Sequence, residues 1–272
     1  MSDFANFKVM SATNRRRAQG FTLTEAIMVI VITGILASMV AVFIQKPVQG
    51  FFDTARRAAL VDAADTVLRR ISRDVREALP NSVRVSGGSA LEFLHVRSAG
   101  RYREQGPGDP LDFTANDTSF DVLGPGVSVQ SGDSIVVYNL GVTGSDAYEG
   151  TSTSRRLAAA PFGALLTSVA ITSATAFPFA SPAKRFQIVD TPVSYVCSGT
   201  QMRRYSGYSI LAPQPVPPAV AGALVADKLT ACSFAYAAGQ SQRDALVTVR
   251  LDLTDTGETV SLIQQIHVNN AP

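Results

Sequence analysis

Gly20-Phe21-Thr22-Leu23-Thr24-Glu25 stands directly before nineteen residues, 26–44, that carry no formal charge. As a helix with about 1.5 Å rise per residue, this apolar run spans roughly 28 Å, which is close to the ~30 Å hydrocarbon core of a bilayer. Three arginines, residues 15–17, precede the run, and Lys8 lies further back. A plain membrane anchor has no use for an acid such as Glu25 at the start of its apolar segment. The stretch therefore predicts a membrane-spanning helix with a functional carboxylate at its start.

Three other interpretations of this segment were weighed. A secretory signal peptide has an apolar core of about 7–15 residues followed by a small-x-small cleavage site; here the core is longer, and no Ala-x-Ala occurs between Ala37 and Gly50. An ordinary signal anchor explains the length and the arginines but leaves Glu25 unexplained. A buried helix of a soluble protein is disfavoured by the uninterrupted apolar length.

The segment Arg-Arg-Arg-Ala-Gln-Gly-Phe-Thr-Leu-Thr-Glu, residues 15–25, resembles the N-terminus of type IV pilins and of type II secretion pseudopilins. In that family a prepilin peptidase cuts after the glycine and methylates the new terminal phenylalanine. The resemblance implies cleavage after Gly20, N-methylation of Phe21 and an assembly contact for Glu25, the fifth residue of the mature chain.

Two features depart from the pattern of that family. Thr24 and Ala26 stand where larger aliphatic residues are frequent. Val42 stands where many major pilins have a proline, and a proline occurs instead at Pro47. We expect Pro47 to kink or loosen the helix, because proline lacks a backbone donor.

The role of Glu25 also follows from chemistry. Cleavage would leave an α-ammonium group on Phe21 at the end of an apolar helix, and an ionised group in lipid requires a partner of opposite charge. Glu25 lies four residues further on, about 6 Å along a helix axis. If neighbouring helices stack with that offset, the carboxylate of one meets the amino group of the next. Such a pair would specify register more than it adds stability.

Charge and length restrict the function of the remaining chain. The 272 residues carry a net charge of +2. Removing residues 1–20, with their four basic side chains and one acidic side chain, leaves 20 basic and 21 acidic groups, or −1. A general basic footprint for nucleic acid is absent, so no nucleic-acid partner is expected. By the positive-inside rule, residues 1–20 are cytoplasmic and the chain after Ile44 is periplasmic.

The two cysteines, Cys197 and Cys232, predict a disulfide in an oxidising periplasm. The alternative is two free, buried cysteines. No Cys-x-x-Cys or Cys/His set predicts a metal, and no cofactor is expected. Because the two histidines, His95 and His267, lie in strand patterns and no catalytic motif occurs, we do not expect an enzyme.

Four segments are predicted: a cleaved cytoplasmic leader (1–20), a membrane helix (21–46), an amphipathic helix (47–79) and a β-rich periplasmic domain (80–272). The amphipathic helix is predicted from apolar side chains at three- and four-residue spacing, and Pro80 is expected to stop it. These apolar positions are Leu60, Ala64, Val67, Leu68, Ile71, Val75 and Leu79.

A basic cluster lies on the same helix, formed by Arg69, Arg70, Arg73 and Arg76. One interpretation is a solvated face with local ion pairs such as Arg70–Asp74. The other is a contact with acidic groups of neighbouring subunits.

In the last segment, two-residue periodicity predicts about ten short strands. They are Ser82–Val85, Leu91–Val96, Phe120–Leu123, Ser134–Leu140, Lys184–Val189, Val193–Ser198, Gln201–Ile210, Ala231–Ala237, Ala245–Thr254 and Thr259–Val268. Residues 151–183 read as a long loop with a short helix around Gly163–Val169. The spacing of the acidic residues at 109–121 favours solvated turns over a calcium site. The fold class is α+β, pilin-like, with a long N-terminal spine helix packed on a largely antiparallel sheet domain.

A predicted hairpin that carries Tyr195-Val196-Cys197 and Arg203-Arg204-Tyr205 resembles the larger minor pilins, including the MshO type of mannose-sensitive haemagglutinin pili, and also J-type pseudopilins. The resemblance implies a minor pilin in the inner membrane and then in a pilus. Its implied partners are other pilins or pseudopilins, the prepilin peptidase, the inner-membrane assembly platform and membrane lipid. Two alternatives remain open: an adhesive, DNA-binding or ligand-binding subunit displayed on the filament, and a membrane-anchored periplasmic enzyme.

Overall fold

The computed structural model describes residues 20–150, 153–172, 175–238 and 245–272. The chain divides into two compact units, Met1–Asp53 and Thr54–Pro272. Helix α1 (Leu23–Arg76) has residues in both units, and it contains Pro47 as an internal residue. The helical segment continues through this proline, because the missing N–H removes a single hydrogen bond from 54 helical residues.

The helix ends three residues earlier than the predicted end at Leu79. The backbone after Arg76 turns into pairing with the neighbouring strand: the N–H of Leu79 donates to the carbonyl of Leu94 at 2.8 Å, and the N–H of Val96 donates to the carbonyl of Glu77 at 2.9 Å. These hydrogen bonds replace the intrahelical bonds that a further turn would make.

The predicted apolar face of α1 is confirmed within the second unit. Every apolar position that the spacing singled out is buried, and Leu79 is buried just beyond the helix end. These side chains share a core with the sheet of β12 (Leu229–Ala237), β13 (Ala245–Asp255) and β14 (Glu258–Val268). Val247, Val249 and Leu251 alternate on β13 and are fully buried in this core, as their spacing predicted.

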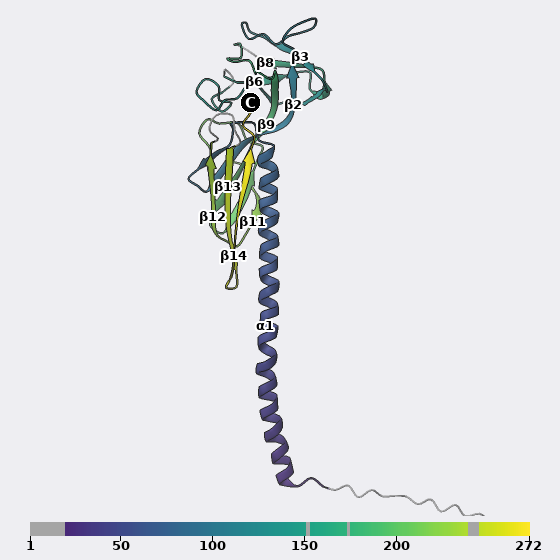
Figure 1. Ribbon diagram of the computed structural model, residues 1–272, viewed down its shortest axis with the longest axis vertical. Helices are drawn as coiled ribbons and strands as arrows, with labels where there is room; N and C mark the ends of the chain where they lie inside the picture. The colour runs from purple at the N-terminus through teal and green to yellow at the C-terminus, as the bar shows by residue number, and fades with distance from the viewer. Residues whose placement is uncertain (1–19, 151–152, 173–174, 239–244) are drawn as a thin grey trace, which may run out of the picture. The chain divides into compact units, whose positions relative to one another are not determined.

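The other strands form a nine-stranded sheet and one separate pair, and their pairings are antiparallel; Figure 1 labels several of these strands. Their bounds are β1 (Arg84–Ser86), β2 (Ala90–Tyr102), β3 (Ser119–Leu123), β4 (Val127–Val129), β5 (Ser134–Val136), β6 (Arg155–Ala159), β7 (Gly163–Leu166), β8 (Ser168–Thr172), β9 (Arg185–Ser198), β10 (Gln201–Tyr205) and β11 (Ala223–Ala226).

The nine-stranded sheet closes on itself. Its order is β1-β2-β3-β8-β6-β5-β9-β10-β11, and β2 pairs with β9 as well. A closed circuit of paired strands results, which leaves no free edge among its members: β2, β3, β8, β6, β5 and β9. A second apolar cluster contains Phe120, Ile135, Val169 and Phe186, one from each of β3, β5, β8 and β9. One long N-terminal helix is followed along the chain by antiparallel sheets, which confirms the predicted α+β, pilin-like fold.

Several predicted elements are wrong in kind or length. Residues 163–169 are not helical but belong to β7 and β8, and the expected loop around them also contains β6. The two strands expected on either side of Pro192 are one strand, β9, whose register with β2 shifts near that proline. The strand expected over Ser134–Leu140 ends at Val136, and Tyr138 has a φ of 52°, outside the β region. The strand expected over Gln201–Ile210 ends at Tyr205.

Candidate functional site

The first residues of the described chain form a capped helix start. Gly20, Phe21 and Thr22 precede the helix, and α1 begins at Leu23. Thr22 occupies the N-cap: its Oγ1 accepts a hydrogen bond from the N–H of Glu25 at 3.3 Å, and its carbonyl accepts one from Ala26 at 3.1 Å. The Gly20–Phe21 bond, where the resemblance implies cleavage, thus lies in non-helical backbone.

Thr22 and Glu25 have the Thr-x-x-Glu spacing of a capping box, which the sequence reasoning missed although the spacing is visible in the sequence. A carboxylate in the first turn is also favoured by the helix dipole. Glu25 therefore has a local structural role beside the predicted assembly contact, and an experiment must separate the two.

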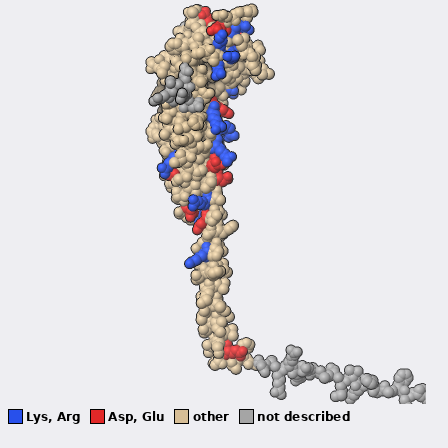
Figure 2. Space-filling model, viewed as in Figure 1, with Lys and Arg blue, Asp and Glu red and all other residues tan. Residues whose placement is uncertain are grey.

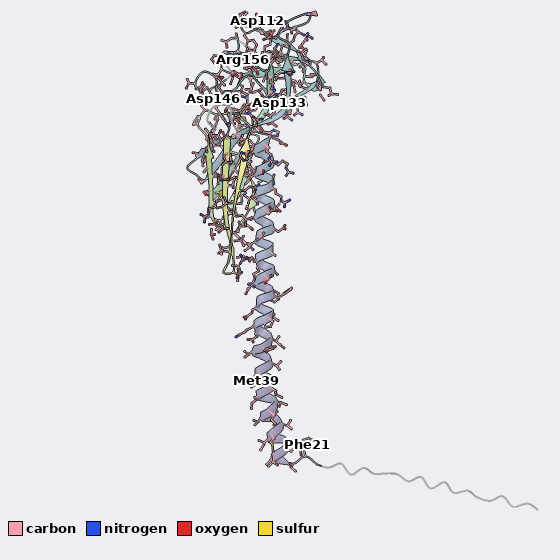
Figure 3. The ribbon with its side chains drawn as sticks, viewed as in Figure 1. Phe21, Met39, Asp112, Asp133, Asp146 and Arg156 are labelled. Carbon is pink, nitrogen blue, oxygen red and sulfur yellow. A yellow bond between two sulfur atoms is a disulfide. The ribbon has the colours of Figure 1, made fainter. Side chains whose placement is uncertain are left out.

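The apolar part of α1 has no partner within the described chain. Phe21 is 74% exposed and Leu23 is 78% exposed, and every residue from 27 to 44 is exposed. Figure 2 shows this part of the helix as an almost uninterrupted uncharged surface, and Figure 3 places Phe21 at its start. By length and composition, α1 is long and apolar enough to cross a membrane.

The polar side chains within this apolar part are satisfied by the helix itself. The hydroxyl of Thr33 donates to the carbonyl of Val29 at 2.6 Å, and that of Ser38 donates to the carbonyl of Ile35 at 2.7 Å. These bonds to the preceding turn leave the donors no need for water. A methyl group added at Gly34 would meet no described atom within 4 Å. The Gly34–Ser38 face is therefore open to a second helix, as small-xxx-small faces require.

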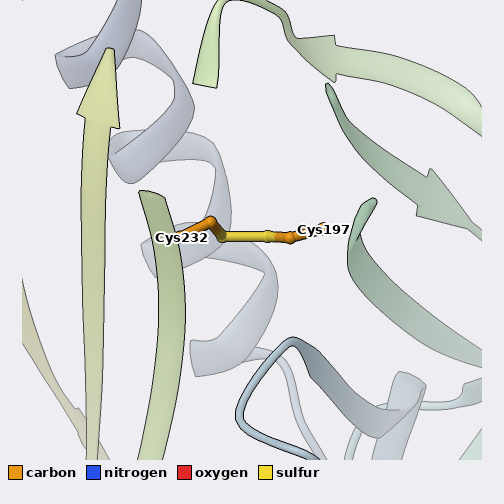
Figure 4. Close-up of a disulfide and its surroundings, with 2 residues drawn as sticks. All are labelled: Cys197 and Cys232. Atoms are coloured by element: carbon orange, nitrogen blue, oxygen red, sulfur yellow. A yellow bond between two sulfur atoms is a disulfide. The ribbon is translucent and has the colours of Figure 1, made fainter. Parts of the chain in front are cut away.

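The predicted disulfide between Cys197 and Cys232 is present (Figure 4). Cys197 lies on β9 and Cys232 lies on β12, so the bond joins the nine-stranded sheet to the three-stranded sheet. A hydrogen bond from the N–H of Phe234 to the carbonyl of Gly88, 2.7 Å long, connects the same two sheets nearby.

The basic cluster of α1 makes a local ion pair, as the interpretation as a solvated face predicts, but the pair is not the one given as the example. Arg69 pairs with Asp65 at 2.7 Å on an exposed surface. The expected Arg70–Asp74 pair is not among the ion pairs of the described residues. Asp74 instead accepts hydrogen bonds of 2.7 Å from Nε of Arg204 and from the hydroxyl of Tyr195. Asp74 thus ties the helix to β9 and β10.

The surroundings of this contact shift two pKa values. Burial, followed by the hydrogen bond to Asp74, raises the pKa of the Tyr195 phenol. Burial alone would lower the pKa of Arg204, but the hydrogen bond and the charge of Asp74, together with the contact to Tyr195, raise that pKa above its ordinary value. Tyr195 therefore stays a neutral donor and Arg204 stays a cation.

The two histidines have different surroundings. Nδ1 of His95 lies 2.9 Å from Asp190 Oδ1, and Nε2 lies 3.2 Å from Glu77 Oε2. The hydrogen bond to Asp190 raises the pKa of His95 against the opposing effect of burial. His267 lies on β14, opposite Leu246 of β13.

The aspartates of residues 109–121 bind groups of the protein, some in local turns and one on β3. Asp112 accepts hydrogen bonds from the N–H and the hydroxyl of Thr114, at 2.6 and 2.7 Å, and Asp121 pairs with Arg103 at 3.0 Å. Among the described residues, no group of three or more His, Cys, Asp or Glu side chains has the arrangement of a metal site.

The comparisons with known proteins identify one feature of the chain, at its N-terminal segment. A family model described as the prokaryotic N-terminal methylation motif matches residues 15–41, which include Gly20, Phe21 and Glu25. No curated protein and no solved structure matches the chain. Residues 15–19 of the match lie outside the described structure, as does the rest of the expected leader. The chain therefore carries a type IV pilin-like signal, and the match supports a pilin-like or pseudopilin-like protein.

Proposed function

We propose that this chain is a minor type IV pilin, made as a prepilin with the leader 1–20. A prepilin peptidase cuts between Gly20 and Phe21 and methylates Phe21, and the mature subunit joins a filament through the N-terminal part of α1. The observation that carries the proposal is the exposed apolar surface of residues 23–44 directly behind the methylation motif.

The physical basis of assembly is the exchange of one apolar environment for another. An exposed helix of this composition is unstable in water and stable in lipid. It is also stable in a bundle of identical helices, where van der Waals packing and small residues such as Gly34 permit close approach. The α-ammonium group on Phe21 and the carboxylate of Glu25 would then pair between subunits and select the axial offset of about 6 Å.

The minor role and the location are part of the proposal. The compact unit Thr54–Pro272 is larger than is typical of major pilins, which supports a minor subunit. Glu25 argues against the topmost tip position, because the tip subunit of secretion systems lacks that acid. We propose an inner-membrane subunit with its C-terminal domain in the periplasm, which contacts other pilins, the assembly platform and lipid before it enters the pilus.

The test separates the charge of Glu25 from its capping role. Glu25→Gln keeps a residue that a capping box accepts but removes the charge. We expect mass spectrometry of the purified mutant to show a mature chain that starts at N-methyl-Phe21. We also expect a strong loss of this subunit from sheared pili.

Asp65→Asn is the matched control, because it removes an exposed acid of the same helix outside the apolar segment; it should assemble normally. Recovery of the wild-type protein with residues 1–20 attached would refute the processing. Wild-type levels of Glu25→Gln in the pili would refute the pairing.

A further inference from the structure

A pocket of about 740 Å³ lies outside the closed circuit of strands, between β5, β6 and β9 and the segment 207–220. Its volume falls in the range of sites that enclose small molecules. The lining combines aliphatic side chains with hydroxyl and charged groups, among them Leu157, Ile210, Ser209, Asp190 and Arg155. None of these residues belongs to the N-terminal signal.

Two adjacent arginines on β6 have opposite environments. Arg156 is fully buried, and its guanidinium donates to the carbonyls of Thr153 and Ala176 at 2.7 and 2.6 Å and lies 4.5 Å from the ring of Phe177. Successive side chains of a strand point to opposite faces. Arg155 therefore points away from Arg156, to the face of Leu157, and both Arg155 and Leu157 line the pocket.

Arg155 is a buried cation without a partner in the described structure. It is only 8% exposed, its Nε has no hydrogen-bond partner, and no ion pair involves it among the described residues. Burial lowers the pKa of its guanidinium. Buried polar groups are nearly always hydrogen-bonded, because an unpaired one costs free energy. Nε itself is closed to solvent, so a partner from outside the chain would reach Arg155 through its two terminal nitrogens, for which no hydrogen bond is found among the described residues.

The one carboxylate of the pocket is already occupied. Asp190 Oδ1 binds His95 and the N–H of Thr191, at 2.9 and 2.6 Å, and Oδ2 lies 3.3 Å from Arg97. Burial alone would raise the pKa of Asp190, but its hydrogen bonds hold that pKa below the ordinary value, so the group is an anion. The carboxylate of Asp190 is thus balanced by its own partners, and Arg155 is the cation of the described lining that has no ion pair.

We propose that this pocket binds a hydroxylated monocarboxylate of hexuronate size, with the carboxylate on Arg155. A planar guanidinium fork matches a carboxylate with two parallel hydrogen bonds. A single guanidinium balances the charge of a monocarboxylate but leaves one charge of a dianion such as phosphate uncompensated in a partly desolvated pocket. Aliphatic walls such as Ile210 suit the C–H face of a sugar ring, and the hydroxyl of Ser209 suits its oxygens. A free acid and the end of an acidic polysaccharide share this chemistry.

The test uses the full chain in detergent micelles and isothermal titration calorimetry. We expect saturable binding of D-glucuronate and none of D-glucose or inorganic phosphate at about 10 mM, where a site with a millimolar Kd is nearly saturated. Binding should be lost in Arg155→Gln and weakened at least about tenfold in Arg155→Lys, which keeps the charge without the fork. Arg101→Gln, an exposed arginine of β2 outside the pocket, is the matched control and should bind normally.

Thermal melting tests whether Arg155→Gln loses binding because the variant no longer folds. Since Arg155 makes no hydrogen bond with its Nε in the described structure, Arg155→Gln should melt no lower than the wild type. Binding of oligouronates as well as the monomer would identify a polysaccharide source, and binding of the monomer alone would identify a free acid; both support the site.

Two results would overturn the proposal: no glucuronate binding by the folded protein, or phosphate binding as tight as that of glucuronate. Neither result bears on the role of residues 20–25, so this proposal and the proposed filament function fail independently.

Discussion

Asp74 provides a polar attachment of the C-terminal part of α1 to the sheet, in addition to the apolar core of the helix. Asp74 is the common acceptor for Arg204 and Tyr195, and the side chains of Asp74 and Arg204 are 15% and 22% exposed. Asp74→Ala removes both hydrogen bonds in one step. It leaves the fully buried Tyr195 without its acceptor and leaves a mostly buried cation, Arg204, on β10.

The magnitude follows from the number and kind of bonds lost. A hydrogen bond to a charged group contributes about 1.5–3 kcal/mol, and an unpaired buried hydroxyl costs about 1–3 kcal/mol. Arg204 retains some access to water, so its contribution is discounted. We expect Asp74→Ala to lower the free energy of unfolding by about 2–4 kcal/mol. Asp74→Asn keeps an acceptor and should lose less.

The assay is denaturant unfolding of the full chain in detergent, followed by far-UV circular dichroism at unchanged m-value. Asp65→Ala is the matched control on the same helix: its pair with Arg69 is 43% and 78% exposed, so the change should cost only a few tenths of a kcal/mol. If Asp74→Ala and Asp65→Ala have equal unfolding midpoints, the reasoning about Asp74 is refuted.

Two further predictions concern the disulfide and a histidine. The Cys197–Cys232 bond closes a separation of 35 residues. On the chain-entropy model, a Cys197→Ser, Cys232→Ser double variant should lose about 4 kcal/mol of stability in denaturant unfolding. Unchanged unfolding under non-reducing conditions would contradict this expectation. The pKa of His95 is higher in the folded protein than its unfolded value of about 6.5. Its contacts with Asp190 and Glu77 therefore stabilise the fold fully at a pH below that unfolded value, and this stabilisation is lost as the pH rises through the folded pKa. His95→Gln should flatten the pH dependence of unfolding near neutral pH, and an identical pH profile for both proteins would show that His95 contributes nothing.

Helix α1 shows which features a local sequence pattern predicts and which it does not. The apolar positions of α1 from Leu60 to Val75 were predicted as a buried face and are buried, because the period of 3.6 residues alone decides which side chains share a face. The end of α1 was missed because it depends on β2, whose backbone competes for the hydrogen bonds of Glu77 and Leu79.

The strands likewise include some that the local pattern predicts and others that it does not. β13 was predicted because its alternation is complete within the strand itself. β6 and β8 lie in a stretch rich in alanine, serine and threonine, and their pairing requires partners such as β5 and β3 that are distant in the sequence. Propensity is weak in such stretches, and cross-strand contacts decide the conformation.

For the candidate sites, the amino-acid pattern was enough to predict the methylation motif, the membrane-length helix, the acid at its start and the disulfide partners, because each depends on a few neighbouring residues or on a count of two cysteines. The tertiary structure alone decided that β2 and β9 close the circuit, that the disulfide joins two sheets and that Arg155 stays without a partner while Arg156 is fully bonded. The physical reason is that closure and the pairing of a buried charge depend on groups that distant segments bring to one place.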